Sequence, residues 1–257
     1  MLIFWINFFL SERLALYSNP IKDSFGISLR KPMSANVNEW LLCASEKEFE
    51  LKAVEMIENL ADEAIKVKGN FSLVLAGGNT PKKIYESLSK KDCDWGNWHI
   101  YFGDERCLSP NDIQRNSLMA EKSFCSKVSI PKNQIHSIPA ELGRNEGAEA
   151  YNKKINSDMV FDLVLLGLGE DGHTASIFPN SEFDENKQAV PISNAPKLPQ
   201  YRVSLTPNRL SMANYVIFLV TGRDKKIALS KFKKSEKIPA SKISALKNLT
   251  VLISGVN

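Results

Sequence analysis

The segment Asp171-Gly172-His173 places a carboxylate two residues before an imidazole, directly after an apolar run. Histidine titrates near neutral pH and is the usual general base, and a nearby carboxylate fixes its orientation and raises its basicity. The surrounding glycines predict backbone N–H groups near Gly169 and Gly172 that are free to face a developing oxyanion. Taken alone, such a segment more often has a structural role, with His173 capping a short helix. The residues at the ends of the other predicted strands therefore decide between a catalytic and a structural interpretation.

The glycines of residues 167–172 also match the spacing G-x-G-x-x-G of dinucleotide-binding sites. A Rossmann site needs a pyrophosphate against a helix N-terminus and an acid after the next strand. Here Glu170 and Asp171 would repel the pyrophosphate, and the helix would reach Pro179 within a few residues. The context therefore disfavours a nicotinamide enzyme.

A glycine turn, Gly77-Gly78-Asn79-Thr80, leads from an apolar run into a helix that begins at Pro81. Its free N–H groups, the Thr80 hydroxyl and the helix dipole suit a phosphate group. The turn lacks the G-K-[ST] of a Walker A loop, which disfavours a nucleoside triphosphate. A tight turn with Thr80 as the helix N-cap is an equally weighted alternative.

Charged side chains follow two further apolar runs. Arg106 is suited to bind a phosphate or carboxylate, and Asp104 to hydrogen-bond sugar hydroxyls or the histidine. Arg202 and Lys225 offer additional cations. Each of these charges alone is more often solvated, and for Arg106 the alternative is a surface ion pair involving Arg115 or a neighbour.

The elements that must position these residues alternate between apolar strands and amphipathic helices. The strands are expected at residues 71–78, 98–105, 161–169, 201–206, 215–222 and 249–254. The helices are expected at residues 46–68, 81–88, 111–124, 207–213 and 224–232. This pattern predicts an α/β fold with a mostly parallel sheet and helices on both faces, a Rossmann-like three-layer sandwich. Ligands of such sheets bind beyond the carboxyl ends of the strands, where the chemical residues lie. The polar loop 180–200, with three prolines, is expected to be a mobile flap.

Composition narrows the class of protein. The chain has 257 residues and a formal net charge of +4, too small for a prediction of nucleic-acid binding. Its four cysteines form no C-x-x-C pair, which predicts reduced thiols and a cytoplasmic protein. The apolar residues 1–10 are too few to span a membrane. Residues 1–32 are expected to be a poorly ordered extension or a mis-called start, and 33–257 a single domain.

Several motifs together resemble the 6-phosphogluconolactonases of the glucosamine-6-phosphate isomerase/6-phosphogluconolactonase superfamily. The motifs are LAGGNTP, YFGDER with Asn116-Ser117, LGLGEDGHTASIFP, RVSLTP and TGRDK, spread over about residues 40–254. The resemblance implies hydrolysis of 6-phospho-D-glucono-1,5-lactone to 6-phosphogluconate in the oxidative pentose phosphate pathway. It implies a small-molecule substrate, no organic cofactor, no required metal, no membrane partner, and a monomer or homodimer.

The resemblance also implies roles for individual residues. His173 would activate water, Asp171 would orient His173, and amides near Gly169 and Gly172 would stabilise the oxyanion. Asp104 and Arg106 would position the sugar or the bound water, Asp104 as a catalytic residue. The phosphate would be held by Gly77, Gly78, Asn79, Thr80, Arg202 and Lys225. The family often has Ser where this chain has Asn79, and an Asn side chain can still donate a hydrogen bond.

Three other functions remain as alternatives. An isomerase/deaminase of the same superfamily needs an additional acid shortly after the histidine, and His173 to Pro179 contains no carboxylate. A non-catalytic sugar-phosphate sensor on this fold would have no need of a general base. A dehydrogenase is the weakest alternative, for the reasons given for residues 167–172.

Overall fold

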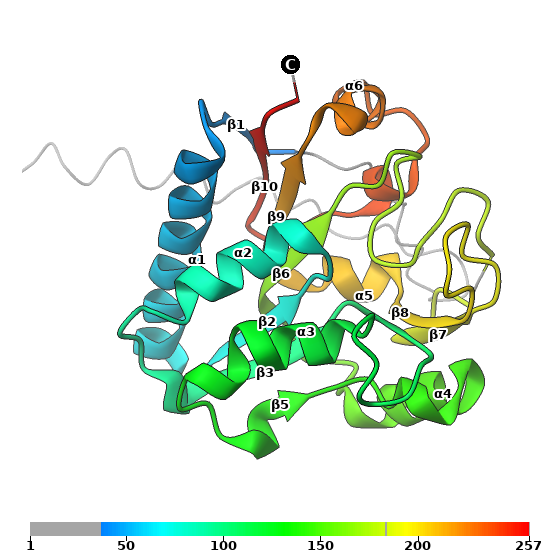
Figure 1. Ribbon diagram of the computed structural model, residues 1–257, viewed down its shortest axis with the longest axis horizontal. Coiled ribbons are helices and arrows are strands. Elements are labelled where there is room, and N and C mark those ends of the chain that lie inside the picture. The colour runs from blue at the N-terminus through cyan, green and yellow to red at the C-terminus, as the bar shows by residue number, and fades with distance from the viewer. Residues whose placement is uncertain (1–36, 183, 257) are drawn as a thin grey trace, which may run out of the picture. The chain divides into compact units, whose positions relative to one another are not determined.

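The computed structural model describes residues 37–182 and 184–256, so the prediction for residues 1–32 lies outside the described part of the chain. A seven-stranded sheet forms the centre, and every pair of neighbouring strands in it is parallel (Figure 1). In spatial order its strands are β1 (Glu39–Leu42), β10 (Asn248–Ser254), β9 (Ala213–Thr221), β6 (Phe161–Gly167), β2 (Phe71–Leu75), β3 (Trp98–Phe102) and β5 (Ile135–His136). The predicted parallel α/β fold is confirmed.

The central strands are apolar because both of their faces are covered. All five residues of β2 and the first six of β6 are buried. The rings of Phe71 and Trp98, paired on neighbouring strands, pack edge to face with 4.8 Å between centroids. Such strands read as continuous apolar runs rather than alternating ones, which is why the sequence identifies them.

The helices divide between the two faces of the sheet. A connection between two parallel strands of one sheet is almost always right-handed. Helices in connections that move along the sheet in one direction therefore lie on one face, and helices in connections that move in the opposite direction lie on the other face. By this rule α1 to α3 share one face, and Figure 1 shows them as neighbours, while α4 to α6 belong to the other. The helices are α1 (Glu46–Lys68), α2 (Asn79–Leu88), α3 (Asn116–Ser123), α4 (Arg144–Lys154), α5 (Pro207–Ser211) and α6 (Lys226–Lys233).

Local chemistry sets the ends of α1. The Ser45 side chain accepts a hydrogen bond from the Glu48 N–H at 3.1 Å and caps the first turn. Gly69, with φ of 82°, ends the helix and donates to the Ile65 carbonyl. The predicted helix 46–68 is therefore confirmed at both ends.

The predicted strand 98–105 is wrong as a single element, because the chain changes sheets at Gly103. The Gly103 N–H donates to the Leu75 carbonyl of the central sheet, and its carbonyl accepts from the Leu205 N–H of a second sheet. That sheet is antiparallel, in the order β4 (Asp104–Arg106), β8 (Arg202–Leu205) and β7 (Ala189–Ile192). The sequence prediction missed β1, β5, α4 and β7, and β7 lies within the loop expected to be a flap.

The sheet reverses direction between β2 and β6. From β2 the connections lead to β3 and β5 on one side, and from β6 they lead to β9 and β10 on the other. Open α/β sheets bind ligands at such a switch point, beyond the carboxyl ends of the strands.

In the described residues no helix is long and apolar enough to cross a membrane.

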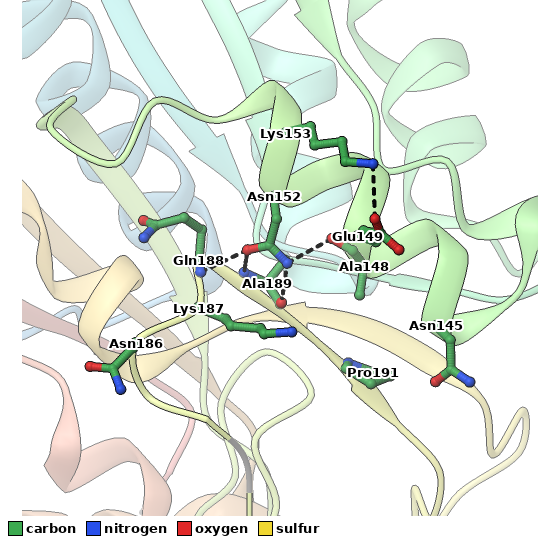
Figure 2. A pocket seen from close by; sticks show the side chains of 10 residues that line it. All are labelled: Asn145, Ala148, Glu149, Asn152, Lys153, Asn186, Lys187, Gln188, Ala189 and Pro191. Carbon is green, nitrogen blue, oxygen red and sulfur yellow. Dashed lines mark hydrogen bonds and ion pairs between the residues drawn. The ribbon is translucent and has the colours of Figure 1, made fainter.

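The outer edge of β7 is covered by α4 through Asn152 (Figure 2). The Asn152 amide nitrogen donates to the Ala148 and Ala189 carbonyls at 2.8 and 2.6 Å, and its oxygen accepts from the N–H groups of Gln188 and Ala189. One side chain thus replaces the hydrogen bonds of a missing neighbouring strand. It borders a surface cavity of about 610 Å³.

Replacing Asn152 by alanine is expected to lower the free energy of unfolding by ~1–3 kcal/mol, because backbone groups of β7 lose their partners. The matched control is Asn145→Ala in the same helix, whose exposed side chain has no hydrogen bond in Figure 2. Its effect should stay within about 0.5 kcal/mol. Urea unfolding followed by tryptophan fluorescence measures both. Equal effects of the two substitutions would contradict the role of Asn152.

Candidate active site

A cavity of about 750 Å³ opens at the switch point of the sheet. The segments that line it follow β2, β3, β6 and β9, and one further segment lies at residues 196–198. The sequence-predicted site residues in its wall are Gly77, Gly78, Asn79, Thr80, Asp104, Arg106, Gly169, Asp171, His173, Arg202 and Lys225. Gly172 is the one predicted residue that does not line the cavity. Residues more than 140 positions apart in the sequence are therefore brought to one wall.

Asp171 and His173 form a hydrogen-bonded pair in this wall. His173 Nδ1 lies 2.5 Å from Asp171 Oδ1, and the same oxygen accepts the His173 backbone N–H at 3.0 Å. The His173 side chain is 26% exposed. Because Nδ1 is occupied by the carboxylate, Nε2 is the ring nitrogen available to accept a proton. This is the geometry of an oriented general base.

The pKa of Asp171 reflects this contact. Partial burial raises the pKa, but the hydrogen bonds from the backbone and ring of His173 outweigh burial, and the net pKa lies below the usual value. The carboxylate therefore stays ionised at neutral pH and favours a proton on Nδ1.

Glycine at position 169 makes room for the histidine ring. A Cβ atom at Gly169 would overlap Nδ1 and Cε1 of His173. The imidazole also contacts the Phe178 ring, with 4.8 Å between centroids. Both the loop backbone and an aromatic ring therefore limit the positions open to the imidazole.

The amides of Gly169 and Gly172 themselves are not among the free N–H groups that the sequence predicts near these residues. The Gly169 N–H donates to the His173 carbonyl at 2.8 Å, and the Gly172 N–H donates to the Gly169 carbonyl at 3.0 Å. Gly172 is required for another reason, since its φ of 86° favours glycine and a Cβ there would lie 2.8 Å from Ile238. These glycines shape the loop rather than expose donors.

The N-terminus of α2 opens into the cavity. Its N-cap is Gly78, and no side chain caps the first turn. The alternative with Thr80 as N-cap is wrong, because the Thr80 hydroxyl bonds instead to the Thr221 hydroxyl at 2.6 Å. The first N–H groups of a helix lack partners within the helix and bind anions well. Gly77 must be glycine because the Asn116 side chain occupies the space of a Cβ.

Asp104 supports the wall and makes no hydrogen bond to His173 within the described chain. The residue is 6% exposed. One carboxylate oxygen accepts from Asn116 Nδ2 at 2.9 Å and the other from Ser176 Oγ at 2.5 Å. Asp104 therefore links two segments of the wall. Asn116 connects it to the glycine turn at residues 77–80, and Ser176 connects it to the loop that carries His173. Of the two contacts predicted for Asp104, to sugar hydroxyls or to the histidine, the second is not formed within the described chain.

Two arginines face each other across the β4–β8 pair. Arg106 and Arg202 are register partners, and both line the cavity. The Arg106 guanidinium donates to the Gln114 carbonyl, and only the backbone N–H of Arg106 donates to a carboxylate, that of Glu105. The alternative of a surface ion pair is therefore not formed within the described chain. Burial lowers the pKa of Arg202 below its usual value, opposed by Asp104 and reinforced by Arg106. This pair gives the wall a positive potential suited to an anion.

Arg202 and Lys225 are also bound within the protein. Arg202 donates to the carbonyls of Pro199 and Lys197 at 3.0 and 2.9 Å. Lys225 Nζ lies 2.7 Å from Asp224 Oδ2 and 3.8 Å from Glu170 Oε1. Arg202 thus anchors residues 197–199, a structural role that the sequence did not indicate.

Sequence reasoning missed several residues of this site. Those that line the cavity or support it are Asn116, Glu170, Ser176, Phe178, Lys197 and Thr221. Asn116 and Ser176 lie inside the motifs quoted from the sequence, but no role could be assigned to either residue from the sequence. The described residues contain no group of three or more His, Cys, Asp or Glu side chains arranged to hold a metal ion.

Comparison with known proteins gives a family match over most of the chain. The family of glucosamine-6-phosphate isomerases/6-phosphogluconolactonase matches residues 44–252. A 6-phosphogluconolactonase of a Nostoc species is 34% identical over 190 residues, which is 70% of this chain and 78% of the relative. The 6-phosphogluconolactonase of Thermotoga maritima is 33% identical over 190 residues, 73% of this chain and 86% of the relative.

Solved structures give the same picture. The crystal structure of the Thermotoga maritima 6-phosphogluconolactonase superposes with a TM-score of 0.77 at 27% identity, over 84% of this chain and all of that one. A monomeric glucosamine-6-phosphate deaminase superposes with a TM-score of 0.74 at 21% identity, over 85% of this chain and 98% of that one. The fold alone therefore does not separate the two activities.

Replacing His173 by alanine is expected to raise the pKa of Asp171, since the hydrogen bond and charge of the ring, which lower that pKa, are lost while burial, which raises it, remains. Carbon-13 NMR titration of the carboxyl groups measures the shift. Asp224 is the internal control, because Lys225 lowers the pKa of its carboxyl independently of the histidine. An unchanged Asp171 pKa would contradict the pairing.

Proposed function

This chain belongs to the glucosamine-6-phosphate isomerase/6-phosphogluconolactonase family, and on that premise we propose that it hydrolyses 6-phospho-D-glucono-1,5-lactone to 6-phosphogluconate. The reaction is the second step of the oxidative pentose phosphate pathway. The observation that carries the proposal is the Asp171–His173 pair at 2.5 Å, set in the same cavity as the uncapped end of α2.

In the proposed mechanism His173 acts as general base through Nε2. It takes a proton from a water molecule, whose oxygen bonds to the lactone carbonyl carbon. The ionised Asp171 carboxylate stabilises the imidazolium that forms. When the bond between the carbonyl carbon and the ring oxygen breaks, His173 returns the proton to that oxygen. The new carboxylic acid then ionises and releases a proton to solvent.

The developing negative charge needs stabilisation from donors other than the Gly169 and Gly172 amides, which are occupied. Arg106 supplies the best candidate, because its side chain lines the cavity and its Nη1 donates to a neutral carbonyl, that of Gln114, rather than to a carboxylate. A guanidinium fixed before the reaction stabilises charge that develops in the transition state.

The phosphate group of the substrate would lie at the N-terminus of α2. The N–H groups after Gly77 point outward from the first turn, and the hydroxyls of Thr80 and Thr221 adjoin them. Lys225 follows β9 directly beyond Thr221 and supplies a cation. Asn79 in place of a serine leaves this backbone cradle intact, since the amides do not depend on the side chain.

The alternative isomerase/deaminase chemistry lacks its acid. Between His173 and Pro179 the structure places Ser176 against Asp104 and Phe178 against the His173 ring. No carboxylate of that segment faces the cavity, because the segment contains none. A proton transfer between two carbons of a sugar phosphate would need one.

The substitution His173→Ala is expected to lower kcat for the lactone by at least ~100-fold, the usual contribution of a general base. Affinity for 6-phosphogluconate should change little, because the phosphate contacts lie elsewhere. A coupled assay with freshly made lactone, corrected for spontaneous hydrolysis, measures kcat, and calorimetry measures affinity. Near-normal turnover in this variant, or efficient ammonia release from glucosamine 6-phosphate by the wild type, would overturn the proposal.

The substitution Gly169→Ala should lower kcat by at least ~10-fold, because the added methyl overlaps the His173 ring and displaces the base by a distance to which catalysis is sensitive. Gly96→Ala is the matched control, since Gly96 does not line the cavity and a Cβ there meets nothing closer than 3.8 Å. Circular dichroism verifies that both variants are folded. Similar kcat values for the two variants would remove this role of Gly169.

A further inference from the structure

Glu170 is a carboxylate of the cavity wall that the proposed mechanism does not use. Asp104 and Asp171 also line the wall, and both are engaged, by Asn116 with Ser176 and by His173 respectively. Glu170 Oε1 instead lies 3.0 Å from Lys197 Nζ and 3.8 Å from Lys225 Nζ. It therefore sits among cations that an anionic ligand would use.

The position of Lys197 is set by a chain of packing contacts. Arg202 donates to the Lys197 and Pro199 carbonyls, and its guanidinium carbon lies 5.7 Å from the centroid of the Phe178 ring. The Phe178 ring in turn packs against His173. The segment that carries Lys197 is thus tied to the base, and the Glu170–Lys197 pair lies at the rim of the same cavity, with side chains 53% and 76% exposed.

Hydrolysis changes the charge of the ligand in this cavity. Water adds to the carbonyl carbon, the bond to the ring oxygen breaks, and the neutral ester becomes a carboxylate with loss of a proton to solvent. The product therefore carries one negative charge more than the substrate. A fixed carboxylate in the wall repels the product more than the substrate by Coulomb's law.

We infer that Glu170 discriminates between substrate and product by charge, weakening the binding of the carboxylate product and so promoting its release. The inference rests on the proposed lactonase function. Glu170 neutralises part of the positive potential of Lys197 and Lys225. After ring opening Glu170 faces the new carboxylate of the product. That carboxylate can pair with Lys197 and Lys225 only in competition with Glu170.

The test compares two ligands that differ only at the first carbon. 6-Phosphogluconate has a carboxylate there, and sorbitol 6-phosphate has a neutral hydroxymethyl group on the same chain. In the isosteric variant Glu170→Gln the Kd of 6-phosphogluconate should fall about two- to tenfold further than the Kd of sorbitol 6-phosphate. The difference should shrink at high ionic strength, because exposed charges are screened.

The matched control is Glu149→Gln. Glu149 is also an exposed carboxylate paired with a lysine, Lys153 at 2.8 Å, but it lines the separate cavity of Figure 2. It should change neither Kd. Product inhibition of lactone turnover by 6-phosphogluconate should strengthen in Glu170→Gln and stay unchanged in Glu149→Gln.

The outcomes separate the inference from the function on which it rests. An equal change in both Kd values in Glu170→Gln, or no change, would overturn the inference while lactone turnover by the wild type leaves the function intact. Absence of lactone turnover and of binding of both ligands by the wild type would overturn the proposed function, and the inference with it.

Discussion

The His173 ring occupies the space in which any side chain at position 169 would lie, and this exclusion sets the geometry of the site. The Phe178 ring packs against the imidazole, and Nδ1 meets the Asp171 carboxylate. The orientation of the base thus follows from steric exclusion on one side and a charge-assisted hydrogen bond on the other. Gly172, with its positive φ, is needed to return the loop to this position.

Electrostatics organises the rest of the cavity. Its wall carries more cations than carboxylates, and each carboxylate has a distinct partner. Asp104 is buried and tied to two neutral donors, whereas Asp171 is tied to the base, and Glu170 contacts lysines at the rim. The excess of cations gives the wall a potential suited to an anion, while each carboxylate keeps a local partner.

Much of the fold was predictable from local patterns. The helix 46–68 has a capping serine before it and a terminating glycine after it. The strands of the central sheet are apolar throughout, and this composition predicts that both of their faces are buried. The prediction failed where tertiary contacts decide. Gly103 divides one apolar run between two sheets, and α4, with few apolar residues, is held against β7 by Asn152 rather than by an amphipathic pattern.

The sequence by itself determined which chemistry was available, since a histidine next to a carboxylate, a glycine turn before a helix and cations after strands are all local features. Only the tertiary structure decided which of their groups are free. The Gly169 and Gly172 amides donate within the loop, Arg202 donates from Nε and Nη2 to the carbonyls of Pro199 and Lys197, and Asp104 accepts from Ser176. The physical reason is that a hydrogen-bonding group satisfied by the fold is no longer available to a ligand, and partners distant in sequence meet only after folding.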